Sequence, residues 1–517
     1  NSVEAKLYAR YKKKKEPEQK PTDRSSDTMV TEKHQTTQSG LKTNSVTEKL
    51  YSRYRKTTHE KGSIDEWLYN AKNLLWSMEN YTSSLPKDEY GVDYGSEYSS
   101  QITDLLYKIS DAAASKDLPQ TRELLSQLRK RHIDLTEELL AQSMLKDEAV
   151  ERVNEMCDSL EGIAMAVCSL GELSDRNKAV IISTGEYLSS TIISYAMNAK
   201  GIRTNWVDAR KMMVTNDAYM KGEPIEEEIS ARVPGIVEEA YKGMDAVITQ
   251  GFIGSNLAGD QTVLGRGGSD YSASLIGMAV DAEKIEIWTD VDGVRSADPR
   301  KVANTKYLEK ISFEEAAEMA HFGAKVLHPL TIEPAVKKNI PIYVLNSTNP
   351  SGKGTAILRN EFIEDGVKSV SFKENIRVIN IFSMRMINTS GFLRRVFEIF
   401  SESKVSVDLI STSEANISVT VDASEKIDSV VEQLSEFAEV IVDDDKSQVS
   451  VIGKNIVKLN GMLKRTFAPL KKCNVYMISQ GASFVNISFV VDREELTEVV
   501  QSLHHHLFET PEELETF

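Results

Sequence analysis

A glycine-rich turn at residues 265–270, Gly-Arg-Gly-Gly-Ser-Asp, constrains this chain more than any other stretch. An apolar run precedes the turn, and residues 271–280 follow it with the apolar spacing of a helix. Small residues between a strand and a helix let the backbone approach a ligand closely, and the helix start presents unpaired N–H groups to an anion. Arg266 adds a guanidinium that binds a carboxylate or phosphate through two hydrogen bonds. The turn therefore predicts an anion site, although an ordinary turn that caps a helix has the same composition.

Apolar runs typical of buried strands alternate with helical segments of about 10–15 residues through the middle of the chain. The predicted strands are residues 179–186, 203–208, 245–254 and 284–290. This alternation predicts an α/β fold with a three-layer parallel sheet, whose ligands lie at the carboxyl ends of its strands. The stretches expected at these ends are Glu186, residues 251–254, residues 266–270 and Asp290. One shared site is therefore predicted.

The segments on either side of this sheet have different patterns. Residues 64–169 carry apolar side chains at helical spacing with charged opposite faces, which is typical of helices that pack on a core. After Leu358, residues 375–422 are predicted to form strand, helix, strand and strand, and residues 448–489 repeat that order. Residues 494–508 are expected to form a closing helix. Two small α+β units of the βαββαβ type are therefore predicted.

Charge and cysteine content limit the classes of function. The 517 residues carry a net charge of −16, but residues 1–62 alone carry +7, so the remaining residues carry −23. An acidic body argues against a core that binds nucleic acid. Three cysteines without metal-ligand spacing fit a reducing compartment and exclude a disulfide framework. Because no apolar run approaches the ~20 residues that span a bilayer, no membrane partner is expected.

Residues 1–62 are predicted to be a disordered basic tail, because they contain almost no apolar cluster. They nevertheless hold a duplicated motif. Residues 1–13 and 44–56 are identical at nine of thirteen positions, and each copy has apolar side chains at i, i+4 and i+8. Each copy is therefore either a short amphipathic helix that folds against a protein partner, or part of a duplicated tail without function. Two copies also suggest avidity for an unknown partner.

Three further motifs follow the glycine-rich turn. They are residues 289–295 (Thr-Asp-Val-Asp-Gly-Val-Arg), residues 297–300 (Ala-Asp-Pro-Arg) and residues 322–329 (Phe-Gly-Ala-Lys-Val-Leu-His-Pro). Taken singly, the first motif fits a solvated turn and the second a surface Arg. The third fits a salt-bridged Lys and a packed His. In this order they resemble the amino acid kinase family, and specifically aspartate kinase. The resemblance covers roughly four-fifths of the chain, from about Tyr98 onward, and includes Gly185-Glu186, Gln250-Gly-Phe252 and two units that look like tandem ACT domains.

This resemblance implies a phosphotransferase that acts on the β-carboxylate of L-aspartate, the first step toward lysine, threonine and methionine. Phosphoryl transfer between two anions depends on alignment and on positive charge at the transferring group. The implied cofactors are ATP and Mg²⁺, and the nucleotide phosphates hold the Mg²⁺ without a dedicated protein metal site.

The resemblance also implies roles for individual residues. Arg266 would clamp a carboxylate of aspartate, Glu186 would meet its amino group, and Asp270 would orient the catalytic cation. The implied catalytic residues are Arg266, Ser269 and Asp270. The implied substrate-binding residues are Thr103, Glu186, Phe252 and Arg266. The implied nucleotide-binding residues are Thr289, Asp290, Arg295, Arg300 and Lys325.

Regulation and dimerisation are implied as well. Asp408 and Glu414 suit the amino group of an effector, and the Gly391 loop suits its carboxylate. The implied effector-binding residues are Met386, Thr389, Gly391, Phe392, Leu393, Ser406, Val407, Asp408, Ser413 and Glu414. The effector would be lysine or threonine, and a purely structural ACT pair is the alternative. The family pairs these domains between chains, so a homodimer is implied.

The sequence departs from the family pattern at two places. The family has a Lys-Phe-Gly-Gly-Thr-Ser loop whose lysine stabilises the transferring phosphoryl group, whereas the Gly-Gly pair of this sequence is Gly267-Gly268. Arg295 stands where the family often has Tyr beside the nucleotide. Three hypotheses follow: an aspartate kinase, a catalytically impaired relative that binds an effector, or a dimeric scaffold that acts through its repeat tail.

These patterns divide the chain into four parts. They are the tail at residues 1–62, an amino acid kinase-like domain with an atypical first part at residues 63–360, and ACT domains at residues 372–447 and 448–517. The expected localisation is cytoplasmic, with a plastid as the alternative.

Overall fold

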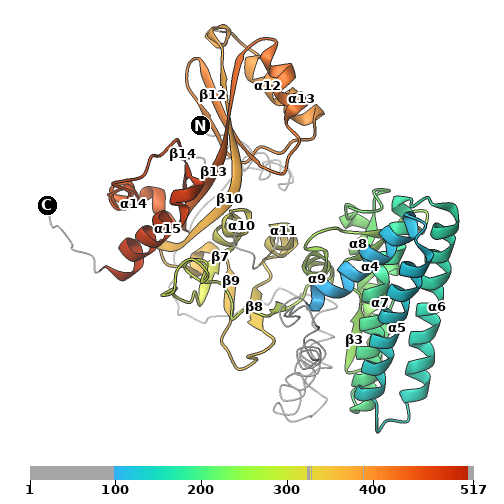
Figure 1. Cartoon of the computed structure of the whole chain (residues 1–517). Helices are drawn as coiled ribbons and strands as arrows, with labels where there is room; N and C mark the ends of the chain where they lie inside the picture. The colour runs from blue at the N-terminus through green and yellow to red at the C-terminus, as the bar shows by residue number, and fades with distance from the viewer. Residues whose placement is uncertain (1–97, 323–326, 328, 388, 482, 511–517) are drawn as a thin grey trace, which may run out of the picture. The chain divides into compact units, whose positions relative to one another are not determined.

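A computed structural model describes residues 98–322, 327, 329–387, 389–481 and 483–510 of the chain. The repeat tail, residues 63–97 and Lys325 lie outside these residues. The described part begins with four helices that pack on one another (Figure 1): α4 (Tyr98–Ala114), α5 (Leu118–Leu139), α6 (Lys146–Leu170) and α7 (Asp175–Ala199). Their shared core contains Leu106, Leu128, Leu160 and Leu188. The helical pattern predicted for this region is confirmed from Tyr98 onward.

The strand predicted at residues 179–186 is wrong, because these residues belong to the first half of helix α7. Ser174 caps this helix by accepting a hydrogen bond from the backbone N–H of Asn177 at 3.3 Å. Ile181, Ile182 and their neighbours are buried against other helices, so the run is apolar on most sides and its period does not separate helix from strand. Glu186 therefore lies in the middle of a helix.

The α/β part distributes its strands over three sheets. β1 (Thr204–Val207) pairs with β3 (Ala246–Thr249). The second sheet contains β2 (Val214–Thr215), β4 (Ile253–Asn256) and β5 (Gln261–Val263). The third contains, in order, β6 (Ile285–Thr289), β8 (Ile342–Asn346), β9 (Thr355–Leu358) and β7 (Lys310–Ser312). The helices of this part are α8 (Glu226–Ala240), α9 (Gly268–Ala279), α10 (Phe313–His321) and α11 (Pro329–Lys338).

Parallel pairing of strands is confirmed for β1 with β3 and for β6 with β8. The strands predicted at residues 203–208 and 284–290 are present as β1 and β6. The strand predicted at residues 245–254 is divided into β3 and β4, because Phe252 adopts a φ of +67° and turns the backbone. Within the described residues no backbone pairing joins β3 to β6, so the expected single sheet appears as separate pieces.

The two predicted α+β units share one antiparallel sheet of order β11-β12-β10-β13-β15-β14. The long strands β10 (Gly366–Phe382) and β13 (Glu439–Lys454) run through both units (Figure 1). The first unit adds α12 (Phe392–Glu402), β11 (Ile410–Thr412), β12 (Asn416–Asp422) and α13 (Asp428–Ser435). The second adds α14 (Met462–Phe467), β14 (Met477–Gln480), β15 (Asn486–Asp492), α15 (Leu496–His504) and the π-helical turn η6 (His505–Glu509). The predicted order of strand, helix, strand and strand is confirmed in both units.

Short helical turns complete the described elements. They are η1 (Ala209–Lys211), η2 (Asn360–Phe362), η3 (Met384–Met386), η4 (Ile456–Lys458) and η5 (Arg493–Glu495). None of the described helices has the length and apolar character that crossing a membrane requires.

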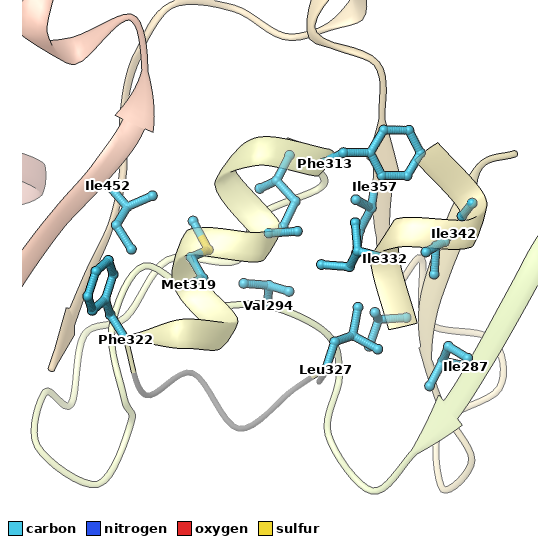
Figure 2. Close-up of a cluster of buried hydrophobic side chains, with 14 of the residues drawn as sticks. Ile287, Val294, Phe313, Met319, Phe322, Leu327, Ile332, Ile342, Ile357 and Ile452 are labelled. Atoms are coloured by element: carbon cyan, nitrogen blue, oxygen red, sulfur yellow. The ribbon is translucent and has the colours of Figure 1, made fainter. Parts of the chain in front are cut away.

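A single apolar cluster connects the four-stranded sheet to the long strands (Figure 2). Its members include Ile287, Ile342 and Ile357 from the sheet, Phe313 and Met319 from α10, Ile332 from α11 and Ile452 from β13. Burial of such side chains stabilises a fold by about 1.5–3 kcal/mol each. The cluster therefore makes the packing of β13 and α10 mutually dependent.

Gly453 offers a test of the strand pairing. A Cβ atom at Gly453 would lie 2.1 Å from the carbonyl oxygen of Gly366 on the neighbouring strand. We expect Gly453→Ala to lower the free energy of unfolding by about 1–3 kcal/mol, because one of the two backbones must move. Denaturant unfolding followed by circular dichroism measures the change.

The matched control is Gly162→Ala on α6, where a Cβ atom would meet nothing within 4 Å. Removing a glycine from a helix interior should raise stability by about 0.5–1 kcal/mol. A Gly453→Ala chain that unfolds at the same denaturant concentration as wild type would show that β10 and β13 are not paired in this register.

Candidate active site

The glycine-rich turn leads directly into helix α9. Gly265 and Gly267 have φ angles of +79° and +72°, a backbone region that glycine occupies without strain. Gly267 is the N-cap residue of α9, and Ser269 and Asp270 lie in its first turn. The backbone N–H of Gly268 donates to the Gly265 carbonyl at 3.0 Å. The N–H groups of Ser269 and Asp270, at the positive end of the helix dipole, favour an anion. The anion site predicted from the turn therefore has the backbone geometry that it needs.

Close backbone contact fixes this turn against the end of strand β3. A Cβ atom at Gly251 would lie 2.9 Å from the Cα atom of Ser269, and one at Gly268 would lie 2.9 Å from the ring of Phe252. The backbone N–H of Phe252 donates a hydrogen bond to the Ser272 hydroxyl at 3.1 Å. The segment of Gly251 and Phe252 therefore packs directly on the segment of Gly268 and Ser269.

A buried polar network connects helix α7 to the same strand end. The side-chain amide of Gln250 donates to the Ser190 hydroxyl at 2.9 Å, and its oxygen accepts from the backbone N–H of Ala209 at 2.9 Å. The indole N–H of Trp206 also donates to the Ser190 hydroxyl, at 3.0 Å. Glu186 lies four residues before Ser190, on the same face of α7. Glu186 therefore faces the Gln250 end of β3, although it is not on a strand.

Burial shifts the titration of the two site carboxylates. Burial raises the pKa of the half-buried Glu186 carboxyl to about 7 and also raises the pKa of Asp270. Burial of a carboxylate without an ion pair lowers stability. Carboxylates with raised pKa values are therefore found mainly where function requires them. Helices α4 and α7 approach each other closely here, since a Cβ atom at Gly185 would be 3.0 Å from the side chain of Ile102.

The carboxyl end of β6 forms a second polar region. The Thr289 hydroxyl donates to Asp290 at 3.1 Å, and the backbone N–H and hydroxyl of Ser347 donate to the Thr289 carbonyl at 2.8 and 3.0 Å. A Cβ atom at Gly277, near the end of α9, would lie 2.8 Å from Ile285 at the start of β6. Because β6 follows α9 and returns along it, the Thr289 end of β6 is directed toward the first turn of α9.

Arg295 and Arg300 have partners of their own. The guanidinium of Arg295 donates to the Thr305 hydroxyl at 3.2 Å and lies 3.7 Å from Asp292. Arg300 is exposed and pairs with Asp298 at 2.5 Å. The interactions found for Arg300 therefore do not connect it to α9. Lys325 lies outside the described residues.

One of the effector candidates, Asp408, carries a buried carboxylate. Asp408 is only 7% exposed, and its carboxylate accepts a hydrogen bond from the Lys373 ammonium at 2.6 Å. The imidazole of His321, at the end of α10, lies 3.7 Å from Asp408. Gly391 has a φ of +89° and caps α12, so its loop presents backbone N–H groups. The Asp408 carboxylate thus joins the first α+β unit to the α10 segment.

Other effector candidates also have structural roles. The ring of Phe392 packs edge-on against Phe437 at 5.5 Å, and Val407 and Met386 pack on the core of the first unit. The Ser413 hydroxyl accepts from the backbone N–H of Asn416 at 3.2 Å. The remaining candidates are Thr389, Leu393, Ser406 and Glu414, which are exposed.

Several supporting residues were missed in the sequence. They are Ser190, Trp206, Ser272, His321 and Lys373. A Ser or Thr on a helix and a Lys on a strand are common surface residues, so no local pattern distinguishes them. Gln250, the partner of Ser190, belongs in contrast to the Gln-Gly-Phe motif that the sequence analysis singled out.

Comparison with known proteins agrees with this architecture. Residues 105–346 match the model of the amino acid kinase family, and residues 379–436 and 449–507 match an ACT domain model. Lysine-sensitive aspartokinase 3 of Escherichia coli (strain K12) is 35% identical over 424 residues, which cover 80% of this chain and 91% of the relative. The chloroplastic aspartokinase 1 of Arabidopsis thaliana is 36% identical over 402 residues, 75% of this chain and 69% of the relative.

Solved structures give the same assignment. The structure of E. coli aspartokinase III in complex with aspartate and ADP (R-state) has a TM-score of 0.69 at 33% identity, and the match covers 79% of this chain and 91% of that chain. The complex of the same enzyme with lysine and aspartate (T-state) has a TM-score of 0.64 at 32% identity, over 79% and 90%. The predicted fold class, an amino acid kinase domain followed by ACT domains, is thereby confirmed. From its glycine-rich turn to its paired ACT domains, the chain belongs to the aspartokinase family.

Proposed function

We propose that this chain transfers the γ-phosphoryl group of ATP to the β-carboxylate of L-aspartate, giving 4-phospho-L-aspartate and ADP. The observation that carries the proposal is the first turn of α9, which packs Ser269 against Gly251 and Gly268 against Phe252 and also carries Asp270. The relative that was crystallised with aspartate and ADP supports these two ligands. The reaction belongs to the synthesis of lysine, threonine and methionine.

The aspartate would bind between α7 and α9. Arg266 is presented by glycines on both sides and would hold a carboxylate of the substrate through two hydrogen bonds. Glu186 would pair with the amino group, which offsets the cost of its burial. Phe252, whose backbone N–H donates to Ser272, would line the remaining surface, and Thr103 is assigned there by resemblance.

The nucleotide would bind at the carboxyl end of β6. Thr289 and Asp290 end this strand, and Arg295 follows two residues after the Gly293 turn. Lys325 is assigned by resemblance alone. Arg300 would exchange Asp298 for a phosphate, since it is exposed and its partner Asp298 is close in sequence. Mg²⁺ would be held mainly through the nucleotide phosphates.

The chemistry of the transfer requires mostly alignment and charge. The substrate carboxylate, the γ-phosphorus and the leaving oxygen must be in line, and positive groups must face the equatorial oxygens. The N–H groups at the start of α9 and the Arg266 guanidinium supply such groups from fixed backbone positions. Asp270 would orient the cation that neutralises the transferring group.

Turnover of aspartate and ATP, measured as the acyl hydroxamate, tests the proposal directly. Turnover at ordinary enzyme rates supports the kinase. Absence of turnover, together with thermal stabilisation by lysine, would favour the alternative of an effector-binding regulatory or scaffold protein.

Arg266→Gln should raise the KM for aspartate by about 10- to 100-fold, because a charge-assisted pair contributes about 1.5–3 kcal/mol. Arg232→Gln is the matched control, since Arg232 forms an exposed pair with Glu228 on α8 at 2.7 Å. Equal values of KM for aspartate in the two variants would remove Arg266 from the substrate site.

The raised pKa of Glu186 predicts that stability and aspartate binding both depend on pH. Its pKa of about 7 in the folded chain lies above the value of an unfolded glutamate, so the folded state binds the extra proton between about pH 4.5 and 7. Wild-type stability should therefore fall with rising pH through this window, and the KM for aspartate should fall as Glu186 becomes ionised.

Glu186→Gln has no titratable carboxyl at this position, so the pH dependence of stability and of the KM for aspartate should both disappear. Its melting temperature should exceed that of wild type by more at pH 8 than at pH 5, while its affinity for aspartate is lost. Scanning calorimetry at the two pH values measures the first effect. A constant difference between variant and wild type would mean that Glu186 is already ionised at pH 5.

We also propose that lysine binds the first ACT unit and inhibits the enzyme. The E. coli relative is lysine-sensitive and has been crystallised with lysine and aspartate. The amino group of lysine would share Asp408 with Lys373, and its carboxylate would meet the Gly391 loop.

Asp408→Asn should therefore raise the lysine concentration for half-maximal inhibition by about tenfold or more. Asp422→Asn is the control, because Asp422 also pairs with Lys373, at 3.5 Å, but lies outside the proposed effector set. A matching loss of lysine response in both variants would assign the effect to Lys373 rather than to the effector.

Further properties are proposed from chemistry alone. A homodimer through the ACT domains is supported by exposed apolar side chains on both units, among them Met384, Leu393, Ile410, Ile478 and Phe484. An unknown protein would bind the repeat tail, and the domain limits given above are retained. Localisation is proposed to be cytoplasmic, or in a plastid as in the chloroplastic relatives.

A further inference from the structure

The segment that carries Arg295 and Arg300 enters the core of the second ACT unit. Ala297 and Val302 belong to the same buried cluster as Phe489 of β15 and Leu503 of α15. Residues proposed to hold the nucleotide are therefore separated by only one or two positions from a regulatory core.

A buried hydrogen-bond chain fixes this segment to helix α15. The hydroxyl oxygen of Ser296 lies 2.8 Å from Nε2 of His504, and Nδ1 of His504 lies 2.9 Å from the carboxylate of Glu509. Ser296 and His504 are both fully buried. The Ser296 oxygen also accepts a hydrogen bond from the backbone N–H of Lys306 at 2.7 Å. The hydroxyl proton of Ser296 can therefore be donated to Nε2 of His504. His504 then carries its proton on Nδ1, where the Glu509 carboxylate accepts it.

This order of hydroxyl, imidazole and carboxylate matches that of a catalytic triad, but burial excludes that role. No substrate reaches a hydroxyl and an imidazole that are both without exposed surface. A carboxylate that fixes the tautomer of a histidine also fixes its ring orientation. The arrangement is therefore suited to holding Ser296 in place.

Other bonds restrain the same segment from both sides. The backbone N–H of Val370, in β10, donates to the Ser296 carbonyl at 2.8 Å. The Gln501 amide, in α15, donates to the Lys301 carbonyl at 2.8 Å. The Lys301 ammonium pairs with Glu374 at 2.8 Å. The segment thus has few ways to move independently of the second ACT unit.

We infer that His504 is a positioning residue for the nucleotide site: through Ser296 it holds the segment between Arg295 and Arg300, so that nucleotide affinity depends on helix α15. The inference rests on the proposed function for the identity of the nucleotide. Small displacements of positioned groups cost catalysis up to about 100-fold, which makes the effect measurable.

The experiment uses the full chain, four single variants and the double variant of Ser296→Ala with His504→Leu. His504→Leu and Ser296→Ala each break the chain, and His504→Gln keeps a hydrogen-bonding group near the position of Nε2. His505→Gln is the matched control, because His505 is exposed and contacts the same Glu509 carboxylate at 3.3 Å. The readouts are the KM for MgATP, the KM for aspartate, the melting temperature and the Kd for ADP by calorimetry.

We expect His504→Leu and Ser296→Ala to raise the KM for MgATP by about tenfold or more, with the KM for aspartate within about twofold of wild type. His504→Gln should recover part of the loss, and His505→Gln should match wild type. The double variant should be no worse than the poorer single variant, because both residues act through one contact.

A purely structural role would lower the melting temperature without separating the two KM values, and that result would overturn the inference. If His504→Leu does not fold, Ser296→Ala, which removes one oxygen, decides the question. If the wild-type chain binds ADP but does not phosphorylate aspartate, the proposed function fails while the inference is still judged by the Kd for ADP. Equal ADP affinity in wild type and His504→Leu, or no ADP binding by wild type, would contradict it.

Discussion

The close approach of the first turn of α9 to the end of β3 is the constraint on which the site depends. Gly251 and Gly268 have no space for a side chain. A Cβ atom at either position would lie only 2.9 Å from Ser269 or Phe252, respectively. This contact places helix N–H groups and a strand end within the same small region. Arg266 gains its position from it as well, since the glycines around it allow φ angles that other residues avoid.

The contact continues into helix α7 through buried polar groups. Gln250 uses both ends of its amide, to Ser190 and to Ala209, so little freedom remains at the strand end. Such fully satisfied networks rigidify a site, whereas a missing partner would cost about 1–3 kcal/mol. Glu186 is the exception within this rigid region. Among the described residues its half-buried carboxylate has no ion pair, which is the condition expected of a group that awaits a cationic partner.

The kinase and ACT parts share apolar packing as well as polar contacts. Ile452 from the long strand β13 completes the core of the four-stranded sheet, and Ala297 from the kinase part enters the core of the second ACT unit. Asp408 joins Lys373 of the first unit to His321 at the end of α10. Because apolar cores are close-packed, the second ACT unit and the segment around Ala297 are expected to move together.

Local rules of the backbone made much of this fold predictable from the sequence. The glycine-rich turn, the helix after it, the strands β1 and β6 and the order of elements in both ACT units depend on residues that are near one another in the chain. The same rules misassigned residues 179–186, since a short apolar run has no period that separates a strand from a buried helix, and only packing against α4 and α6 decided the outcome. Hydrogen-bond partners that are far apart in sequence were also determined only by the tertiary structure. Ser296 and His504 are 208 positions apart, and nothing local to either residue specifies the other; the fold alone brings a hydroxyl and an imidazole to 2.8 Å.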